Sequence, residues 1–289
     1  MLSGFIEAAS RRVALGIRRR WLTLPPVQSV RSRNRIARQK EHGAKPIAHP
    51  ILREVSEKLE SEAIVPMARA RLRSLLDEAA AVQVDELIRK LNGGWTWPCT
   101  DLLESDDVCR MFPEVYKIGL SDKLLDLAEN YLGERCVFSN CNLTRQPRQS
   151  SRAGTQLWHT DIEDDRMVRI LIYLNDVSPG GGAFEYLSAS DTAAVHNYRP
   201  GYLQEEVASR SVPERCRRHY IAEAGSAVVF DGTRVLHRAG LPTSADRFSL
   251  SLTYTSRAPR YILPATRLKR GTRDLIWQSL SERQRQAMP

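Results

Sequence analysis

Hydrophobic residues recur at every third or fourth position between residues 50 and 91, a spacing that predicts helices. The residues of this pattern are Leu52, Val55, Leu59, Leu72, Leu75, Leu76, Ala79 and Ala80. The sequence Asn92-Gly93-Gly94 is a typical place for such a region to end. A further helix is expected over about 121–131, with Ser121-Asp122 as cap candidates and Gly133 at its end.

After Gly133 the pattern changes to short apolar runs separated by Pro, Gly, Asn and Asp, which predicts strands. The runs are Cys136 to Leu143, Val168 to Asn175, Ala183 to Leu187, Ala227 to Phe230 and Arg247 to Thr255. Helices followed by strands predict an α+β fold with a mainly β core, a sandwich or barrel buttressed by the N-terminal helices. Residues 189–219 are long and poorly patterned, which is typical of a lid or functional loop.

The composition is that of a globular protein, and it argues against membrane-spanning and disulfide-rich secreted proteins. Of 289 residues, 42% are hydrophobic and 27% are charged. The longest apolar run, Ile170 to Leu174, is five residues, whereas a bilayer-spanning helix needs roughly 18–20. The five cysteines are odd in number and form no C-x-x-C pair, so we expect no transmembrane segment and a reducing, cytoplasmic location.

The net charge of +9 is confined to one end of the chain. Residues 1–45 hold eleven Lys or Arg and two acids, while the remainder is balanced. We therefore predict a basic N-terminal extension, residues 1–45, and a single domain, residues 46–289. A neutral body argues against a nucleic-acid partner. Pro25-Pro26 should stop any helix in the extension, which is either a solvated tail, a weak contact to an anionic surface or, in a eukaryotic source, an organelle presequence.

The triplet His159-Thr160-Asp161 is the clearest chemical signal. In an extended strand, side chains two apart share a face with Cα atoms about 6.6 Å apart, so the imidazole and the carboxylate can reach one metal ion. His237, 76 residues after Asp161, could complete the two-His, one-carboxylate face of non-haem Fe(II) oxygenases. The triplet alone is weak, because a structural His-Asp hydrogen bond also accounts for it.

The run from Arg247 alternates, with Arg247, Ser249, Ser251 and Thr253 on one face and hydrophobic residues on the other. One interpretation is a half-buried strand with a solvated outer face. The other places the polar face inside a barrel, where the planar guanidinium of Arg247 would bind a dicarboxylate. Periodicity does not decide between them.

Two segments carry a resemblance to a known family: "QLWHTDIEDDRMVRILIYLNDVSPGGGAFEYLSAS" and "GSAVVFDGTRVLHRAGLPTSADRFSLSLTYT". They resemble the Fe(II)/2-oxoglutarate-dependent dioxygenases, in particular the phytanoyl-CoA dioxygenase-like branch, over about residues 138–256. The resemblance implies a double-stranded β-helix (a cupin-like jelly roll) with a catalytic core of about 136–256. It implies that His159, Asp161 and His237 bind the metal, with no catalytic residue beyond these ligands, and that Arg247 and Ser249 bind 2-oxoglutarate.

Other site residues are matched more loosely. Tyr173 and Arg148 are candidates to bind 2-oxoglutarate, and Asn142 to bind cosubstrate or substrate. Substrate contacts are expected from Trp95, Trp97 and Tyr198, each of which could equally be ordinary packing. Family members often carry Gly-Ser-His after the strand 183–187, where this chain has Ser188-Ala189-Ser190-Asp191.

The resemblance implies Fe(II) as cofactor, with 2-oxoglutarate and O2 as cosubstrates. The expected reaction is hydroxylation of a small organic molecule or a carrier-bound acyl group, with succinate and CO2 as co-products. Asp161 favours hydroxylation over halogenation, and desaturation or ring formation stays open. The alternatives are the same chemistry on a macromolecule, such as a protein side chain, and a non-catalytic jelly-roll binding protein. Neither the substrate's identity nor the oligomeric state follows from the sequence.

Overall fold

The structure is a computed structural model that describes residues 24–43, 47, 49–94, 96–97, 101–195, 198, 201–261 and 267–289. The chain divides into two compact units, residues 1–45 and 46–289. In the first unit, helix α2 (Pro25–His42) buries none of its residues and ends at Gly43, whose φ is +67°. The sequence predicted that Pro25-Pro26 would stop any helix in the preceding apolar pattern. The same prolines begin α2, because proline at the first turn removes only an N–H that has no helical partner. The apolar pattern of residues 1–22 lies outside the described residues.

Helices precede the strands in the second unit, as predicted. They are α3 (Pro50–Glu62), α4 (Arg69–Leu75), α5 (Glu78–Asn92), α6 (Ser105–Met111), α7 (Pro113–Ile118) and α8 (Asp122–Leu132). Residues 50–91 are not wholly helical, however, because strand β1 (Ile64–Met67) interrupts them and pairs with β7 (Ala227–Phe230). Pro66 is compatible with β1 because that strand lies at the edge of its sheet.

The strands form two antiparallel sheets. The remaining strands are β2 (Leu102–Leu103), β3 (Cys136–Gln146), β4 (Val168–Tyr173), β5 (Phe184–Tyr186), β6 (Arg218–Tyr220), β8 (His237–Arg238) and β9 (Arg247–Ser256). The large sheet has the order β1-β7-β4-β9-β3-β2 and the small sheet the order β6-β5-β8. This arrangement confirms the predicted α+β class with a mainly β core.

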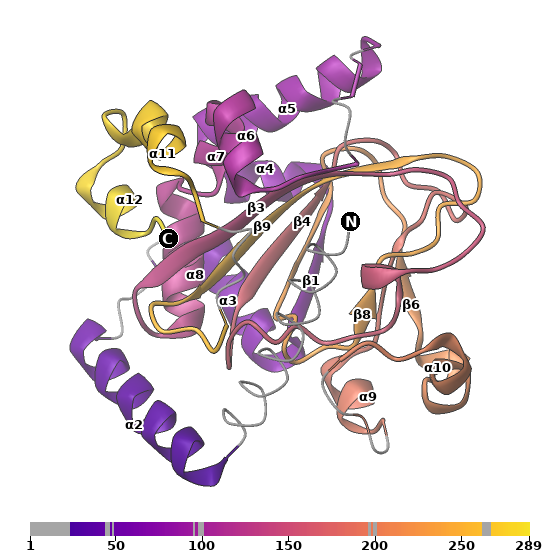
Figure 1. Cartoon of the computed structure of the whole chain (residues 1–289), viewed down its shortest axis with the longest axis horizontal. Coiled ribbons are helices and arrows are strands. Elements are labelled where there is room, and N and C mark those ends of the chain that lie inside the picture. Colours follow the sequence, from indigo (N-terminus) through magenta and orange to yellow (C-terminus); the bar gives the residue numbers. More distant parts are fainter. Residues whose placement is uncertain are drawn as a thin grey trace, which may run out of the picture. The chain divides into compact units, whose positions relative to one another are not determined.

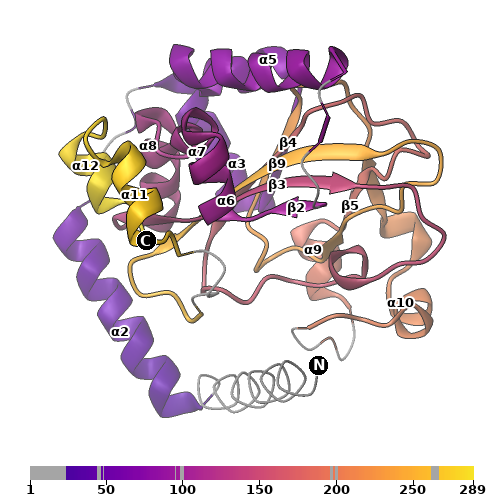
Figure 2. The ribbon, with the colours of Figure 1, turned by 45° about the horizontal axis from the view of Figure 1, so that its top comes forward.

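The large sheet separates a hydrophobic core from a polar interior. Leu250 and Leu252 of β9 pack with residues of α3, α5, α7 and α8 in one continuous buried cluster. Figures 1 and 2 show α3, α7 and α8 on one side of the large sheet and the small sheet on the other. The alternate residues Arg247, Ser249 and Thr253 are 2–3% exposed although they are polar. The polar face of β9 therefore lines the interior between the sheets, as the second interpretation of the alternation required.

The region 189–219 is more ordered than its sequence indicated. It contains α9 (Ala189–Ala193), α10 (Glu205–Ser211) and the short 3-10 helix η2 (Glu214–Cys216). Ser188 caps α9 by accepting a hydrogen bond from the Asp191 backbone N–H at 3.0 Å. Buried residues from this region pack around Trp158, which follows the 3-10 helix η1 (Gly154–Gln156).

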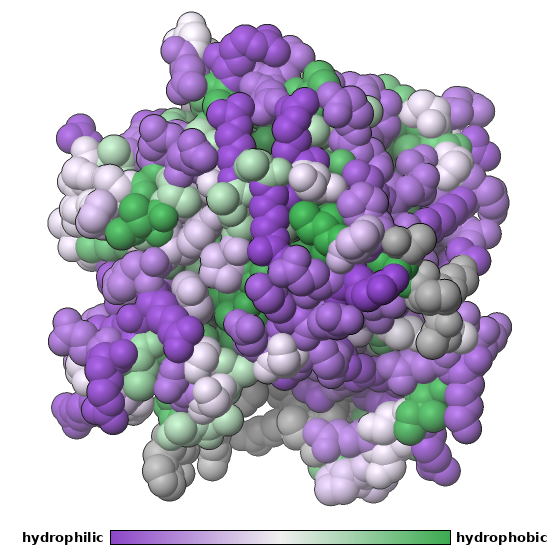
Figure 3. Space-filling model, turned by 180° about the vertical axis from the view of Figure 1, so that it is seen from behind, coloured by the Kyte–Doolittle hydropathy of each residue, from purple (hydrophilic) through white to green (hydrophobic). Residues whose placement is uncertain are grey.

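The chain closes with α11 (Arg270–Trp277) and α12 (Glu282–Gln286). Figure 3 shows a mainly hydrophilic face on which hydrophobic residues are scattered rather than gathered in one patch. Within the described part of the chain, no helix has the length and apolarity that crossing a bilayer requires.

Candidate metal centre

His159 and His237 lie directly opposite each other on neighbouring extended segments. Each backbone N–H donates to the other residue's carbonyl oxygen at 3.0 Å. Their ring centroids are 4.5 Å apart, and the side chains are buried. Antiparallel pairing therefore brings together two imidazoles that are 78 positions apart in the sequence.

Each imidazole is oriented by a hydrogen bond to the backbone carbonyl two residues before it. Nδ1 of His159 lies 2.8 Å from the Leu157 carbonyl, and Nδ1 of His237 lies 2.9 Å from the Val235 carbonyl. A carbonyl only accepts, so each Nδ1 carries the proton and each Nε2 keeps its lone pair. Burial lowers the pKa of His159 and lowers that of His237 well below its usual value. Neutral imidazoles with free Nε2 atoms are the form that binds a metal.

Asp161 completes the cluster. Its Oδ1 lies 3.9 Å from Nε2 of His159 and 3.7 Å from Nε2 of His237. One donor atom from each residue lies within 4.8 Å of the others. Two ligands bound at roughly 2.1 Å to one ion lie at most about 4.2 Å apart, and both distances from Asp161 Oδ1 are within that limit. Two imidazoles and one carboxylate are also the donor set of a non-haem Fe(II) site, so the residues fit the implied metal.

The second carboxylate oxygen of Asp161 faces Arg169. Nε of Arg169 lies 3.2 Å from Oδ2 of Asp161, and its Nη2 lies 3.2 Å from Oε1 of Glu163. The sequence analysis did not single out Arg169 or Glu163. A signal was present, since Arg169 is the one charged residue inside the otherwise uncharged β4 run VRILIY.

The small sheet carries a second network that fixes His237. Arg238, the next residue, lies 2.7 Å from Glu185 of β5 and 2.9 Å from Glu205 of α10. Arg152 also contacts Glu185, at 3.1 Å. These ion pairs add to the backbone pairing that holds β8 against β5.

Arg247 is a buried cation in the same interior. It is 3% exposed, its Nη1 donates to the Gly182 carbonyl, and its Nε has no hydrogen-bond partner. Burial lowers its pKa. No carboxylate forms an ion pair with it among the residues that the structure describes. A buried guanidinium without an anion is costly, so this position fits a carboxylate ligand such as 2-oxoglutarate.

Ser249 and Tyr173 lie beside Arg247. They are cross-strand partners on β9 and β4, and both are buried. The Tyr173 hydroxyl donates to the Tyr220 carbonyl at 2.9 Å and accepts from the Phe184 N–H at 2.8 Å. Its hydrogen-bonding capacity is therefore largely used by the protein, which makes Tyr173 a support for Arg247 and Ser249.

Polar atoms of β3 face the same interior. Asn142 pairs with Ser251, and Gln146 pairs with Arg247. The side-chain oxygens of Asn142 and Gln146 are buried and have no hydrogen-bond partner. Buried acceptors of this kind are expected where a ligand supplies the missing donor. Gln146 was not foreseen from the sequence, although it lies opposite Arg247.

The structure brings the remaining predicted residues to other places. Arg148 is exposed beyond the end of β3. Trp97 packs against Phe248 with ring centroids 5.0 Å apart and the rings tilted, on the helical side of the sheet. The Tyr198 hydroxyl accepts from the Thr160 N–H at 2.8 Å and so holds the centre of the His-x-Asp triplet. Trp95 lies outside the described residues.

Comparison with known proteins supports the fold. No protein-family model and no curated sequence matches this chain. Among solved structures, EctD from S. alaskensis in its apoform aligns with a TM-score of 0.51 and 16% identity, covering 79% of this chain and 82% of EctD. The epimerase SnoN in complex with Fe3+, alpha ketoglutarate and nogalamycin RO aligns with a TM-score of 0.50 and 17% identity, covering 75% and 92%.

A third similar structure is HygX from Streptomyces hygroscopicus with iron bound, with a TM-score of 0.50, 15% identity, and 71% and 87% of the two chains covered. At identities this low, the structural alignments establish the architecture alone, and they confirm the predicted jelly roll. The chain therefore has the fold of the iron- and 2-oxoglutarate-dependent non-haem enzymes, with a two-histidine, one-carboxylate cluster inside it.

Proposed function

We propose that this chain is an Fe(II)- and 2-oxoglutarate-dependent oxygenase that acts on a small organic molecule or a carrier-bound acyl group. The observation that carries the proposal is the buried cluster His159, Asp161 and His237 in a jelly-roll interior that also contains the buried, unpaired cation Arg247. Succinate and CO2 are the expected co-products.

Each residue has a separate task in this proposal. The iron, when bound, supplies O2 activation coupled to oxidative decarboxylation of 2-oxoglutarate. His159, Asp161 and His237 hold it, with Nδ1 hydrogen bonds fixing both imidazoles and Arg169 fixing the carboxylate. Arg247 binds the outer carboxylate of 2-oxoglutarate, supported by Ser249. The surrounding buried side chains keep bulk water away from the reacting groups.

Several finer assignments belong to the proposal. The sequence segments around His159 and His237 support the phytanoyl-CoA dioxygenase-like branch, and the presence of Asp161 supports hydroxylation. The balanced charge of residues 46–289 supports a substrate other than nucleic acid. A cytoplasmic location is supported by the free cysteines Cys109, Cys136, Cys141 and Cys216.

Iron binding and 2-oxoglutarate turnover test the proposal directly. The anaerobic full chain should bind one Fe(II), and 2-oxoglutarate should then produce a weak visible charge-transfer band. In air, substrate-independent turnover should release succinate slowly. His159→Ala, Asp161→Ala and His237→Ala should each abolish the band, because each removes one of three metal ligands.

His219→Ala is a matched control, because His219 lies on β6 and is exposed. It should leave both iron binding and succinate release unchanged. The band persisting in two of the three ligand variants would contradict the metal site, and a wild-type chain that binds iron but releases no succinate would contradict the proposed reaction.

A further inference from the structure

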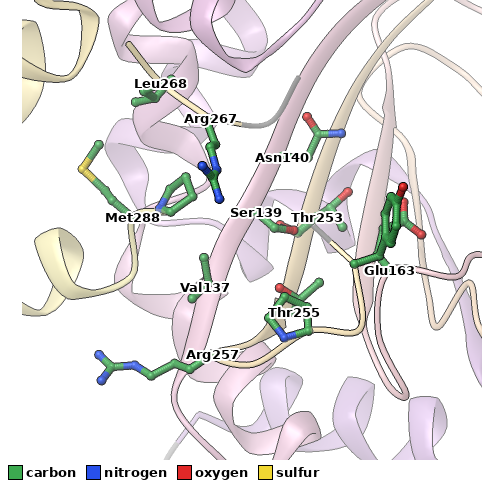
Figure 4. Close-up of a pocket in the computed structure, with 13 residues that line it drawn as sticks. Val137, Ser139, Asn140, Glu163, Thr253, Thr255, Arg257, Arg267, Leu268 and Met288 are labelled. Carbon is green, nitrogen blue, oxygen red and sulfur yellow. The ribbon is translucent and has the colours of Figure 1, made fainter. Parts of the chain in front are cut away.

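A pocket of about 410 Å³ lies between the polar face of the large sheet and the C-terminal segment. Residues of β3 and β9 form its floor, and Glu163 lies on one side of it (Figure 4). Tyr261 also lines the pocket. Leu268 and Met288 contribute an apolar wall opposite them. The volume is in the range of pockets that bind small organic ligands.

The floor contains hydroxyl groups that the protein leaves unsatisfied. Thr253 and Thr255 are 2% and 1% exposed, and both Oγ1 atoms are buried without a hydrogen-bond partner. Both residues line the pocket. A buried hydroxyl without a partner destabilises a protein, so two neighbouring ones point to a ligand that completes their hydrogen bonds.

Arg267 gives the pocket its charge. Its side chain points into the pocket, whereas the side chain of Arg257 points away from it (Figure 4) and donates to the Gln286 carbonyl at 3.4 Å. Glu163 also lines the pocket, and Arg169, the ion-pair partner of its carboxylate, contacts Asp161 as well. Arg267 is exposed, and among the described residues no carboxylate forms an ion pair with it, so its guanidinium is available to an anion in the pocket.

The strand register connects this pocket to the metal centre. Thr253 is the direct cross-strand partner of Arg169, which contacts Asp161. In the other direction along β9, Ser249 pairs with Tyr173 beside Arg247. Thr253 lies four positions after Ser249 on β9, so their Cα atoms are roughly 13 Å apart. The 2-oxoglutarate residues and the pocket thus lie at opposite ends of one strand, on the face that also bears the Arg169 contact to Asp161.

We infer that this pocket binds the substrate of the proposed oxygenase and that the substrate is a small organic anion. Its anionic group binds Arg267, its other polar groups bind Thr253 and Thr255, and its apolar part lies against Leu268 and Met288. The inference rests on the proposed function, since it names the substrate class for that same centre. It also gives the C-terminal segment a role in specificity.

The test measures binding without turnover. The full chain is loaded with Fe(II) and saturating 2-oxoglutarate under anaerobic conditions, so that the Arg247 side is already occupied. The probe is a metabolite extract separated by anion exchange into a retained, anionic fraction and an unretained fraction. Compounds held by the protein on ultrafiltration are then identified by mass spectrometry. We expect compounds from the anionic fraction to be held, and at least tenfold less by Arg267→Gln.

Arg257→Gln is the matched control, because Arg257 lines the pocket while its guanidinium points away from it. This substitution should change binding less than twofold. Thr253→Val keeps the shape of the side chain and removes its hydroxyl. It should weaken binding at least fivefold while the free energy of unfolding stays the same or rises. A fall in that free energy would show that the hydroxyl serves the fold.

The outcomes separate this inference from the proposed function. Binding confined to the unretained fraction, equal binding by Arg267→Gln, or no compound held would overturn the inference. Slow succinate release without any added compound still tests the proposed oxygenase independently. Admitting O2 to the held compounds should raise succinate release by wild type and Arg257→Gln.

Discussion

Arg169 and Asp161 form an ion pair in which Nε lies 3.2 Å from Oδ2, while the other carboxylate oxygen faces both histidines. The arginine therefore occupies one oxygen and leaves Oδ1 for the metal. The adjacent ion pair with Glu163 keeps the guanidinium in place. Partners that orient a metal ligand in this way commonly contribute a factor of about 10–100 to metal affinity.

Arg169→Gln should accordingly weaken Fe(II) binding by about tenfold or more, because Asp161 loses the contact that fixes its carboxylate. Arg169→Lys should be intermediate, since an ammonium cannot contact both carboxylates as the planar guanidinium does. Anaerobic Fe(II) titration measures both. Arg73→Gln, which removes exposed ion pairs to Asp85 and Glu78, is the control and should have no effect. If Arg169→Gln bound iron with unaltered affinity, Arg169 would not position Asp161 and would serve only the stability of the fold.

Gly232 provides the second contact to Asp161. Its carbonyl accepts the Asp161 N–H at 2.8 Å, and a Cβ added to Gly232 would lie 1.8 Å from Asp161 Oδ2. Gly232→Ala should thus displace the carboxylate and reduce iron affinity, with a stability loss of about 1–3 kcal/mol from overpacking.

Gly271→Ala is the comparison, because a Cβ there meets nothing within 4 Å. Iron titration and urea unfolding of the two variants should differ clearly. If Gly232→Ala bound iron as tightly as Gly271→Ala, Asp161 would not be held in the position described.

The sequence was sufficient for the cluster of His159, Asp161 and His237 and insufficient for what surrounds it. His159 and Asp161 share a face by local geometry, and His237 follows an apolar run, so all three could be predicted. Arg169 lies near Asp161 because β4 and β7 pair in one particular register, with Arg169 opposite Phe230, and because Asp161 is held by Gly232 just beyond β7. That register depends on the packing of the whole sheet, which no single segment encodes. The pocket at Thr253 was missed for the same reason.

Arg247 should determine the requirement for 2-oxoglutarate. Arg247→Ala removes charge-assisted hydrogen bonds of about 1.5–3 kcal/mol each, so the half-saturating 2-oxoglutarate concentration should rise at least tenfold. Iron binding should be unchanged, because the three ligands remain. Succinate release against 2-oxoglutarate concentration measures the effect.

Arg148→Ala separates the two arginines that the sequence offered for this task. Arg148 is exposed, so its variant should keep the wild-type requirement for 2-oxoglutarate. An altered requirement in Arg148→Ala together with a normal one in Arg247→Ala would reverse the assignment. Alternation along the strand could not choose between a solvated and an internal Arg247; the burial of Arg247, Ser249 and Thr253 could.

Some residues could not have been placed from sequence by any local argument. Trp97 and Tyr198 were both aromatic candidates for a substrate pocket. Trp97 packs on Phe248, which has the opposite parity to Arg247 on β9 and therefore the opposite face. Tyr198 comes from the region 189–219, and its contact with Thr160 spans 38 residues. Aromatic character alone does not distinguish packing, positioning and ligand contact.

The basic extension should be dispensable for chemistry. It forms a separate unit, residues 1–45, and carries the chain's net charge of +9. A chain that starts at Pro46 should fold, bind Fe(II) and turn over 2-oxoglutarate at the full-length rate. It should lose attraction to anionic vesicles, since each Lys or Arg near such a surface contributes about 1 kcal/mol within a Debye length. Co-sedimentation at low and high salt measures this, with neutral vesicles as the control.

Equal sedimentation of both chains would make the extension a solvated tail. A shortened chain that fails to fold would show that residues 1–45 stabilise the catalytic unit.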